Sequence, residues 1–188
     1  MKKLLLSPVW SLMLLGILGY VFYINPTFIE SLRLRYFDQL IINQPKVENN
    51  IYTVDIDEAT INQYGQWPFP RGNYAAIIED LYARGAGLVV WNVLMSEEDR
   101  SGEDHILALT MEQYPVILTM LGAEEGKNEP INPGATIVNS DFLDRVPSVR
   151  STIANLNDLE SRAWGSGITN SWPELDGVTR RIPLVVLA

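Results

Sequence analysis

The chain has 188 residues, with 14 Lys and Arg against 23 Asp and Glu and a formal net charge of -9. This acidic balance argues against a nucleic-acid binder, which needs a basic surface to neutralise phosphates. Apolar residues make up 47% of the chain and charged residues 20%, which argues against intrinsic disorder. One histidine and no cysteine exclude disulfides, thiol catalysis and Cys/His zinc sites.

An uncharged apolar run from Leu4 to Ile24 follows Lys2 and Lys3. As a helix rising about 1.5 Å per residue, it is long enough to cross a hydrocarbon core of about 30 Å. The lysines before it and the aromatic residues near its end predict an uncleaved anchor, with the N-terminus in the cytoplasm and the rest outside. A cleaved signal peptide and a buried helix of a soluble protein are the alternatives, although no small-x-small cleavage site follows the run.

A second helix is predicted over residues 27–42, where apolar residues recur at helical spacing on one face and charged residues occupy the other. It continues the anchor outward after a break at Asn25-Pro26. The sequence therefore divides into an anchor (1–25), a connecting helix with a polar linker (26–50) and a compact domain (51–188).

The compact domain shows alternating strand and helix patterns. We predict strands over 51–57, 87–95 and 115–121, and helices over 58–64, 73–84, 104–114 and 155–163. The nearly continuous apolar run at 87–95 is typical of a strand covered on both faces. This order predicts an α/β fold with a mostly parallel central sheet and flanking helices.

The end of the chain predicts a closing antiparallel hairpin. Its strands are residues 165–172 and 178–187, and Asp176-Gly177 supplies the turn signal. Residues 122–150 are a polar excursion in which no element is predicted. Because the sequence stops inside an apolar strand pattern, we expect it to be the N-terminal piece of a longer protein.

Acidic residues follow two of the predicted strands. Asp55, Asp57 and Glu58 come after the first strand, and residues 97–99 after the second. At the carboxyl ends of parallel strands, such oxygens can bind Mg²⁺ or Ca²⁺. Alternatively, Asp57 or Glu58 caps the next helix and the 97–99 run is solvated. The Asp-x-Asp spacing is similar to that of haloacid-dehalogenase phosphatases, but Ala59 stands where that family has Thr or Val.

Arg71 follows two prolines and precedes a predicted helix. With the free backbone N–H groups of that helix it could hold a carboxylate or phosphate. Alternatively, it pairs with one of the nearby carboxylates. Trp67 and Phe69 could form one wall of a pocket, or fill the core.

The segment from Val54 to Asp99 resembles the core of a type-two CHASE domain, a cyclase/histidine-kinase-associated sensory extracellular domain. The residues that carry the resemblance lie in order along residues 33–187: Arg35-Tyr-Phe-Asp38, Val54–Glu58, Trp67-Pro-Phe-Pro-Arg71, Gly85-Ala86, Glu97 and Asp176-Gly-Val-Thr-Arg180-Arg-Ile-Pro183-Leu.

The resemblance implies an extracytoplasmic sensory module of a bacterial receptor, joined inside the cell to a cyclase or a kinase. Two departures stand out. The family usually carries further membrane helices after the domain, and Asn92 stands where it often has Asp after the apolar strand.

We therefore predict a sensor domain anchored in the bacterial cytoplasmic membrane, without catalytic residues, a metal or a cofactor of its own. It would bind an unknown small ligand, form a homodimer and shift the connecting helix at 27–42. The alternatives are a metal-dependent phosphoester hydrolase that uses the Asp55/Asp57 cluster and a structural domain of the cell envelope. The candidate ligand-binding residues are Asp55, Asp57, Trp67, Arg71, Asn92 and Glu97.

Overall fold

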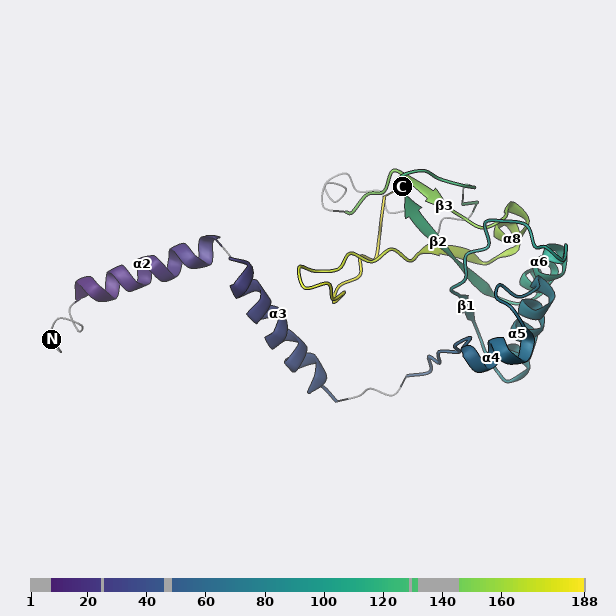
Figure 1. The fold of residues 1–188 in the computed structure, drawn as a ribbon, viewed down its shortest axis with the longest axis horizontal. Coiled ribbons are helices and arrows are strands. Elements are labelled where there is room, and N and C mark those ends of the chain that lie inside the picture. Colours follow the sequence, from purple (N-terminus) through teal and green to yellow (C-terminus); the bar gives the residue numbers. More distant parts are fainter. Residues whose placement is uncertain (1–7, 25, 46–48, 129, 132–145, 188) are drawn as a thin grey trace. The chain divides into compact units, whose positions relative to one another are not determined.

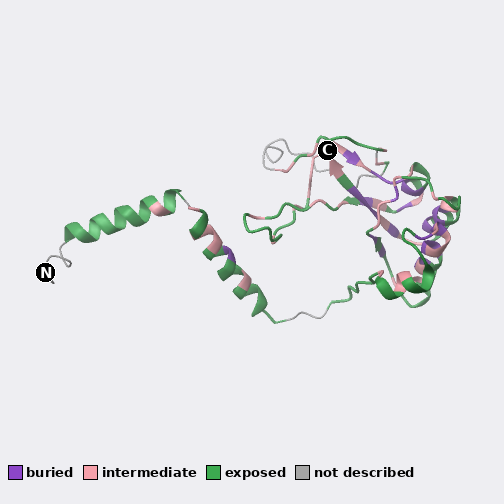
Figure 2. Cartoon of the chain, in the orientation of Figure 1, coloured by how far each residue is buried: buried purple, intermediate pink, exposed green. Residues whose placement is uncertain are grey.

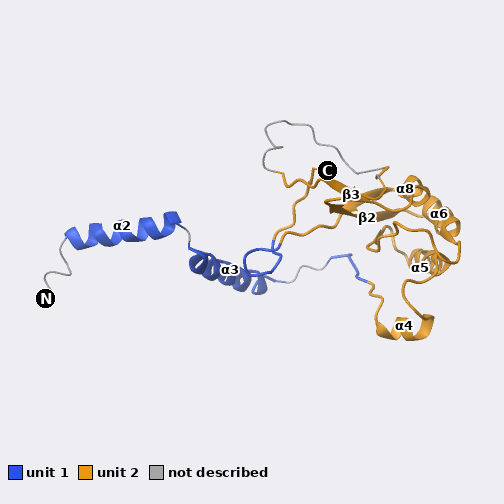
Figure 3. Cartoon of the chain, turned by 45° about the horizontal axis from the view of Figure 1, so that its top comes forward, with its two compact units in different colours: residues 1–53, 173–180 blue, residues 54–172, 181–188 orange. Residues whose placement is uncertain are grey.

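The computed structural model describes residues 8–24, 26–45, 49–128, 130–131 and 146–187. The chain divides into two compact units (Figure 3). The helical unit comprises residues 1–53 and 173–180, and the sheet unit comprises residues 54–172 and 181–188. Residues 173–180 thus group with the helices of the N-terminal region and not with the chain on either side of them.

Two helices form the greater part of the helical unit (Figure 1). Helix α2 spans Pro8–Ile24 and helix α3 spans Thr27–Ile42, as predicted for the latter. Within the described residues, no single helix is long and apolar enough to cross a membrane. The pair α2 and α3 meets the requirements of length and composition together, but with a bend of 80° at the break. Residues 4–7 of the predicted anchor lie outside the described residues.

The sheet unit alternates helices and strands. The helix predicted at 58–64 is confirmed with the same ends, and five other predicted elements are confirmed with shifted ends. Its elements are α4 (Glu58–Tyr64), α5 (Arg71–Ala83), β1 (Val89–Trp91), α6 (Asp104–Gln113), β2 (Val116–Ala123), β3 (Ser151–Ile153), α8 (Asn157–Arg162) and β4 (Gly165–Ile168).

Local signals set the ends of the first two helices of this unit. The side chain of Asp57 accepts a hydrogen bond from the Thr60 backbone N–H. Asp57 therefore caps α4, which is one of the alternatives that the sequence predicted. Helix α5 begins directly after Pro70, and it stops before Gly85, whose φ of 97° suits glycine.

Strand β2 is the centre of the sheet. It pairs in parallel with β1 along one part of its length and with β4 along an overlapping part, and antiparallel with β3 at its carboxyl end. Helix α6 connects β1 to β2, which makes a βαβ unit. The α/β class and the mostly parallel sheet are therefore confirmed.

The core lies on one face of this sheet. Helix α6 packs against both α5 and α8, and buried residues of these helices form one apolar cluster with buried residues of β1 and β2. Figure 2 shows where buried residues lie along the chain. The largest fully buried apolar side chains are Tyr74, Phe69, Ile78, Met95, Leu107, Met111, Leu118 and Leu159. On the opposite face Val90 is 68% exposed. The prediction that the 87–95 strand is covered on both faces was therefore wrong.

The strand predicted at 51–57 is also not formed, and among the residues that the structure describes this segment pairs with no strand. Its apolar side chains are largely exposed, at 81% for Ile51, 85% for Tyr52 and 65% for Val54. β-branched and aromatic residues favour a strand only where neighbouring side chains cover them, and among the described residues only Ile56 of this segment packs against the core.

The predicted closing hairpin was wrong as well. Strand β4 pairs in parallel with β2, and no residue of the described 178–187 segment belongs to a strand, although Leu187 bridges to Ser148. The predicted turn does form, because the Gly177 N–H donates to the Glu174 carbonyl at 2.9 Å. Beyond the turn, the Arg180 side chain binds Asp38 on α3.

Candidate functional site

Arg71 is the best-connected of the predicted site residues. It is the first residue of α5, and its side chain is only 8% exposed. Its Nε lies 3.2 Å from Asp104 Oδ1, and its Nη2 donates to the backbone carbonyl of Glu97 at 3.2 Å. The guanidinium also lies over the Tyr74 ring, 5.6 Å from the centroid. Arg71 thus fastens the loop after β1 to the start of α5.

The first backbone N–H groups of α5 are also engaged within the chain. Those of Arg71 and Gly72 donate to the carboxylates of Asp99 (3.2 Å) and Glu103 (3.0 Å) respectively. Carboxylates near a helix N-terminus interact favourably with its dipole. Of the two alternatives for Arg71, the structure shows the ion pair, and the anion position that the sequence suggested is filled by side chains of this protein.

An aromatic cluster adjoins Arg71. Trp67 packs edge-on against Phe69, with ring centroids 5.4 Å apart, and lies 5.9 Å from Tyr74, which in turn lies 5.2 Å from Trp91. Phe69 and Tyr74 are buried, and burial raises the pKa of the Tyr74 hydroxyl. Trp67 is 38% exposed, so it is the member of the cluster that a ligand can reach.

The acidic residues do not assemble into a metal centre. Asp57 is exposed, and its Oδ1 accepts from both the backbone N–H (2.9 Å) and the hydroxyl (2.7 Å) of Thr60, which lower the pKa of its carboxyl group. Asp55 and Asn92 are exposed. Over the part of the chain that the structure describes, no three Asp, Glu or His side chains converge to hold a metal ion.

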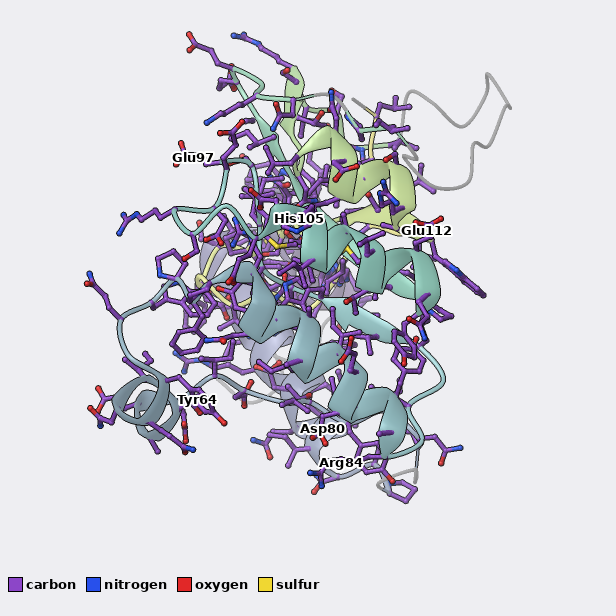
Figure 4. The ribbon with its side chains drawn as sticks, turned by 90° about the vertical axis from the view of Figure 1, so that its right-hand side faces the viewer. Tyr64, Asp80, Arg84, Glu97, His105 and Glu112 are labelled. Atoms are coloured by element: carbon purple, nitrogen blue, oxygen red, sulfur yellow. The ribbon has the colours of Figure 1, made fainter. Side chains whose placement is uncertain are left out.

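Glu97 lies on the outside of the loop after β1 (Figure 4) and forms an ion pair with Lys127, with 2.9 Å between Oε1 and Nζ. This pair lowers the pKa of the Glu97 carboxyl group. The structure therefore places Trp67, Arg71 and Glu97 in one chain of neighbours. It shows no contact that brings Asp55, Asp57 or Asn92 to them.

A buried polar network, which the sequence analysis missed, connects the chain after β1 with β2, α8 and β4. The Asn155 side chain accepts from the Met95 N–H (2.8 Å) and donates to the Thr119 carbonyl (2.8 Å) and to Glu160 Oε1 (2.7 Å). Glu160 Oε2 accepts from the Ser166 hydroxyl. Asn155 and Glu160 are both fully buried. Two polar residues near a short helix give no pattern in the sequence that would distinguish them from solvated ones.

An open hollow of about 490 Å³ lies at the carboxyl end of β2. Ligands of open α/β sheets bind at such strand ends. We call it the strand-end hollow, and its lining residues are Gly122, Ala123, Glu124, Ser148, Val149, Arg150, Asn170 and Trp172.

The strongest ionic cluster belongs to the helical unit. The Arg180 side chain, 5% exposed, binds both carboxylate oxygens of Asp38 on α3, at 2.6 and 2.8 Å, and those of Asp176 at 2.9 and 2.7 Å. Glu174 lies 3.3 Å away. We call these four residues the α3 latch. Hydrogen bonds from Arg180 lower the pKa of the Asp38 carboxyl group, and that of Asp176 from 3.8 to about 2.

The latch brings together two motifs that lie at opposite ends of the sequence, Arg35–Asp38 and Asp176–Leu184. A family model described as "CHASE2 domain" matches residues 11–188, which is nearly the whole chain. The chain belongs to the CHASE2 family. CHASE2 domains are extracytoplasmic sensor domains of signalling receptors. No match was found among curated proteins or among solved structures.

In this CHASE2 domain, the 173–180 segment carries three of the four latch residues, and the chain on either side of it runs close to the strand-end hollow. Asn170 and Trp172, just before the segment, line the hollow. After the segment, Leu187 exchanges backbone hydrogen bonds with the chain at Pro147 (2.9 Å) and Val149 (2.8 Å), and Val149 also lines the hollow.

Proposed function

We propose that this CHASE2 domain is the membrane-anchored, extracytoplasmic sensor of a bacterial signal-transduction receptor, and the N-terminal part of a receptor with a cyclase or kinase output. The apolar composition of α2, with two lysines before the predicted anchor, supports anchoring with the N-terminus in the cytoplasm. The CHASE2 family supports the sensory role. Homodimer formation is part of the proposal, since a dimer lets two anchors change their relation to each other.

The proposed stimulus is a small ligand bound at the carboxyl-end edge of the sheet. Trp67 and Glu97 offer accessible contacts there, and Arg71 holds the loop that carries Glu97. Asp55, Asp57 and Asn92 remain in the proposed site because the three residues are exposed.

The observation that carries the proposal is the α3 latch. A sensor must connect its ligand-binding part to the helix that enters the membrane, and Arg180 fastens a segment rooted at the strand-end hollow to Asp38 on that helix. A ligand that binds one state of the sheet unit more tightly shifts the population of latch states by that difference in affinity. Helix α3 then passes the shift to the anchor.

Membrane insertion is tested first, in the full chain expressed in bacteria. We expect the protein to stay in the membrane after alkaline carbonate washing, and a reporter fused to its C-terminus to be active outside the cytoplasm. Release by carbonate, or a cytoplasmic reporter, refutes the proposal.

The ligand site is tested by thermal-shift screening of the reconstituted chain against metals, nucleotides and small anions. For any compound that raises the melting temperature, Arg71→Ala and Asp57→Asn should weaken binding. If neither variant changes the affinity, these residues are not part of the site.

The latch is tested with one spin label on α3 and one on the 173–180 segment, at cysteines introduced into this cysteine-free chain. Asp38→Asn removes one carboxylate of the latch and should broaden the distribution of distances between the two labels. Asp80→Asn is the matched control, because Asp80 pairs with Arg84 on the exposed side of α5 (Figure 4). If the distance distribution of Asp38→Asn is unchanged, the latch does not hold the 173–180 segment against α3.

A further inference from the structure

One face of α3 is open to solvent although it is apolar. Phe28, Leu32, Tyr36 and Leu40 are exposed by 71%, 49%, 68% and 50%. With about 100° and 1.5 Å per residue, side chains four residues apart fall on one side of the helix and extend over about 18 Å. We call these four residues the α3 stripe.

The opposite side of α3 is the side that packs within the helical unit. Leu34 is 2% exposed, the Glu30 side chain is 16% exposed, and Asp38 belongs to the latch. These three residues are also spaced by four, and they lie about half a turn from the stripe. The 173–180 segment therefore leaves the stripe uncovered.

The charges on α3 are arranged unevenly around this stripe. Arg33 and Arg35 lie about 80° to either side of its centre, and both are exposed. The two acidic residues of the helix lie on the packed side, where Glu30 pairs with Arg33 at 3.1 Å and Asp38 pairs with the latch arginine. The stripe thus presents an apolar surface between two cationic side chains, in a chain whose net charge is negative.

We infer that the α3 stripe lies in the interface of an anionic phospholipid membrane, on the outer leaflet. This inference rests on the proposed function, in which α2 crosses the same membrane, since α2 ends at Ile24, only four residues before Phe28. An interfacial helix buries its apolar face about 5–10 Å deep and places arginines against lipid phosphates. Aromatic residues such as Phe28 and Tyr36 suit this depth.

A second copy of the chain fits the stripe less well. In a parallel pair of helices that leave one membrane together, Arg33 of one copy would face Arg35 of the other across the seam. Like charges at such flanking positions disfavour pairing. Anionic lipid, in contrast, complements both arginines at once.

The experiment uses the full chain reconstituted in vesicles of phosphatidylcholine and phosphatidylglycerol. Because the chain has no cysteine, Leu32→Cys can be labelled with an environment-sensitive fluorophore. Phe37→Cys is the matched control, since it lies on the same helix about 140° away. We expect the label at residue 32 to emit at shorter wavelength, and to lose more intensity to spin-labelled lipids than the label at residue 37. Arg33→Gln combined with Arg35→Gln should reduce this loss when phosphatidylglycerol is present.

Carbonate washing of the same vesicles separates the two proposals. If the chain is released, the proposed anchoring fails. If the chain is retained and the two labels are quenched equally, the membrane contact of the stripe is refuted while the anchor stands. Disulfide-linked dimers of unlabelled Leu32→Cys, without lipid quenching of the labelled protein, would show that a second copy covers the stripe and would also overturn the inference.

Discussion

Asn155→Ala should destabilise the sheet unit more than any substitution of an exposed asparagine. The side chain of Asn155 is fully buried and connects the Met95 N–H, the Thr119 carbonyl and the Glu160 carboxylate. Its removal takes one hydrogen bond from each of these buried groups, so its effect comes from three partners at once.

The lower limits of the individual terms give the magnitude. Loss of a partner costs a buried neutral group about 1–3 kcal/mol, and a hydrogen bond to a charged group contributes about 1.5–3 kcal/mol. Two neutral groups and one charged group therefore give a loss of about 3.5 kcal/mol, from a total stability of about 5–15 kcal/mol. For a chain of this length that lowers the melting temperature by about 7–14 °C.

Thermal unfolding of the full chain in lipid nanodiscs, followed by tryptophan fluorescence, measures this shift. Asn157→Ala is the matched control because Asn157 is exposed on α8, and surface substitutions change stability by about 0.5 kcal/mol or less. Ser166→Ala removes one hydrogen bond to Glu160, and it replaces Asn155→Ala as the test of the network if that variant does not fold. If Asn155→Ala melts together with its control, the network does not stabilise the fold and the reasoning is refuted.

Three further predictions concern the latch, the loop after β1 and the chain next to β3. Because the pKa of Asp176 is lowered from 3.8 to about 2 in the folded state, its contribution is complete well above pH 3.8 and is lost as the pH falls toward 2. The protection factors of the α3 amides, which compare their exchange with the intrinsic rate at each pH, should be constant from pH 7 to 5 and fall below pH 4. Arg71→Lys should lower stability by about 1.5–3 kcal/mol, since a lysine cannot make both side-chain hydrogen bonds, whereas Arg84→Lys, at an exposed ion pair, should leave urea unfolding unchanged. Gly126→Ala should destabilise by about 1–3 kcal/mol, because the added Cβ would lie 2.6 Å from the Thr152 carbonyl oxygen. Gly167→Ala has no atom within 4 Å of its new Cβ, and equal melting temperatures of these two glycine variants would contradict the packing argument.

Helices were the most predictable part of the fold, because their signals are local. The 27–42 helix agrees in full with α3, and the helices of the sheet unit differ only at their ends. Apolar spacing, the Asp57 cap and the glycine after α5 act within a few residues of each other. Strand prediction was poorer, as the 51–57 segment and the closing hairpin show, because a strand depends on a partner that the local sequence does not contain.

The candidate site also has a part that the sequence predicted and a part that it did not. The motif around Trp67 and Arg71 could be found from sequence, since its residues are contiguous, and so could the family resemblance. The ion pairs of Arg71 could only be stated as an alternative, because they depend on a loop that lies about 30 residues further along the chain. The Asn155 network gave no signal, because each of its residues is unremarkable by itself and only burial makes it a network.

By itself, the sequence of this CHASE2 domain determined the helices, the apolar N-terminal run, the α/β class and the family, all of which depend on the order of residues along the chain. Only the tertiary structure decided that Asp38 and Arg180 meet, that Arg71 is engaged within the protein, and that the apolar face of α3 is left uncovered. The physical reason is that ion pairing and burial depend on distance in space, and residues 142 positions apart come together only when the whole chain has folded.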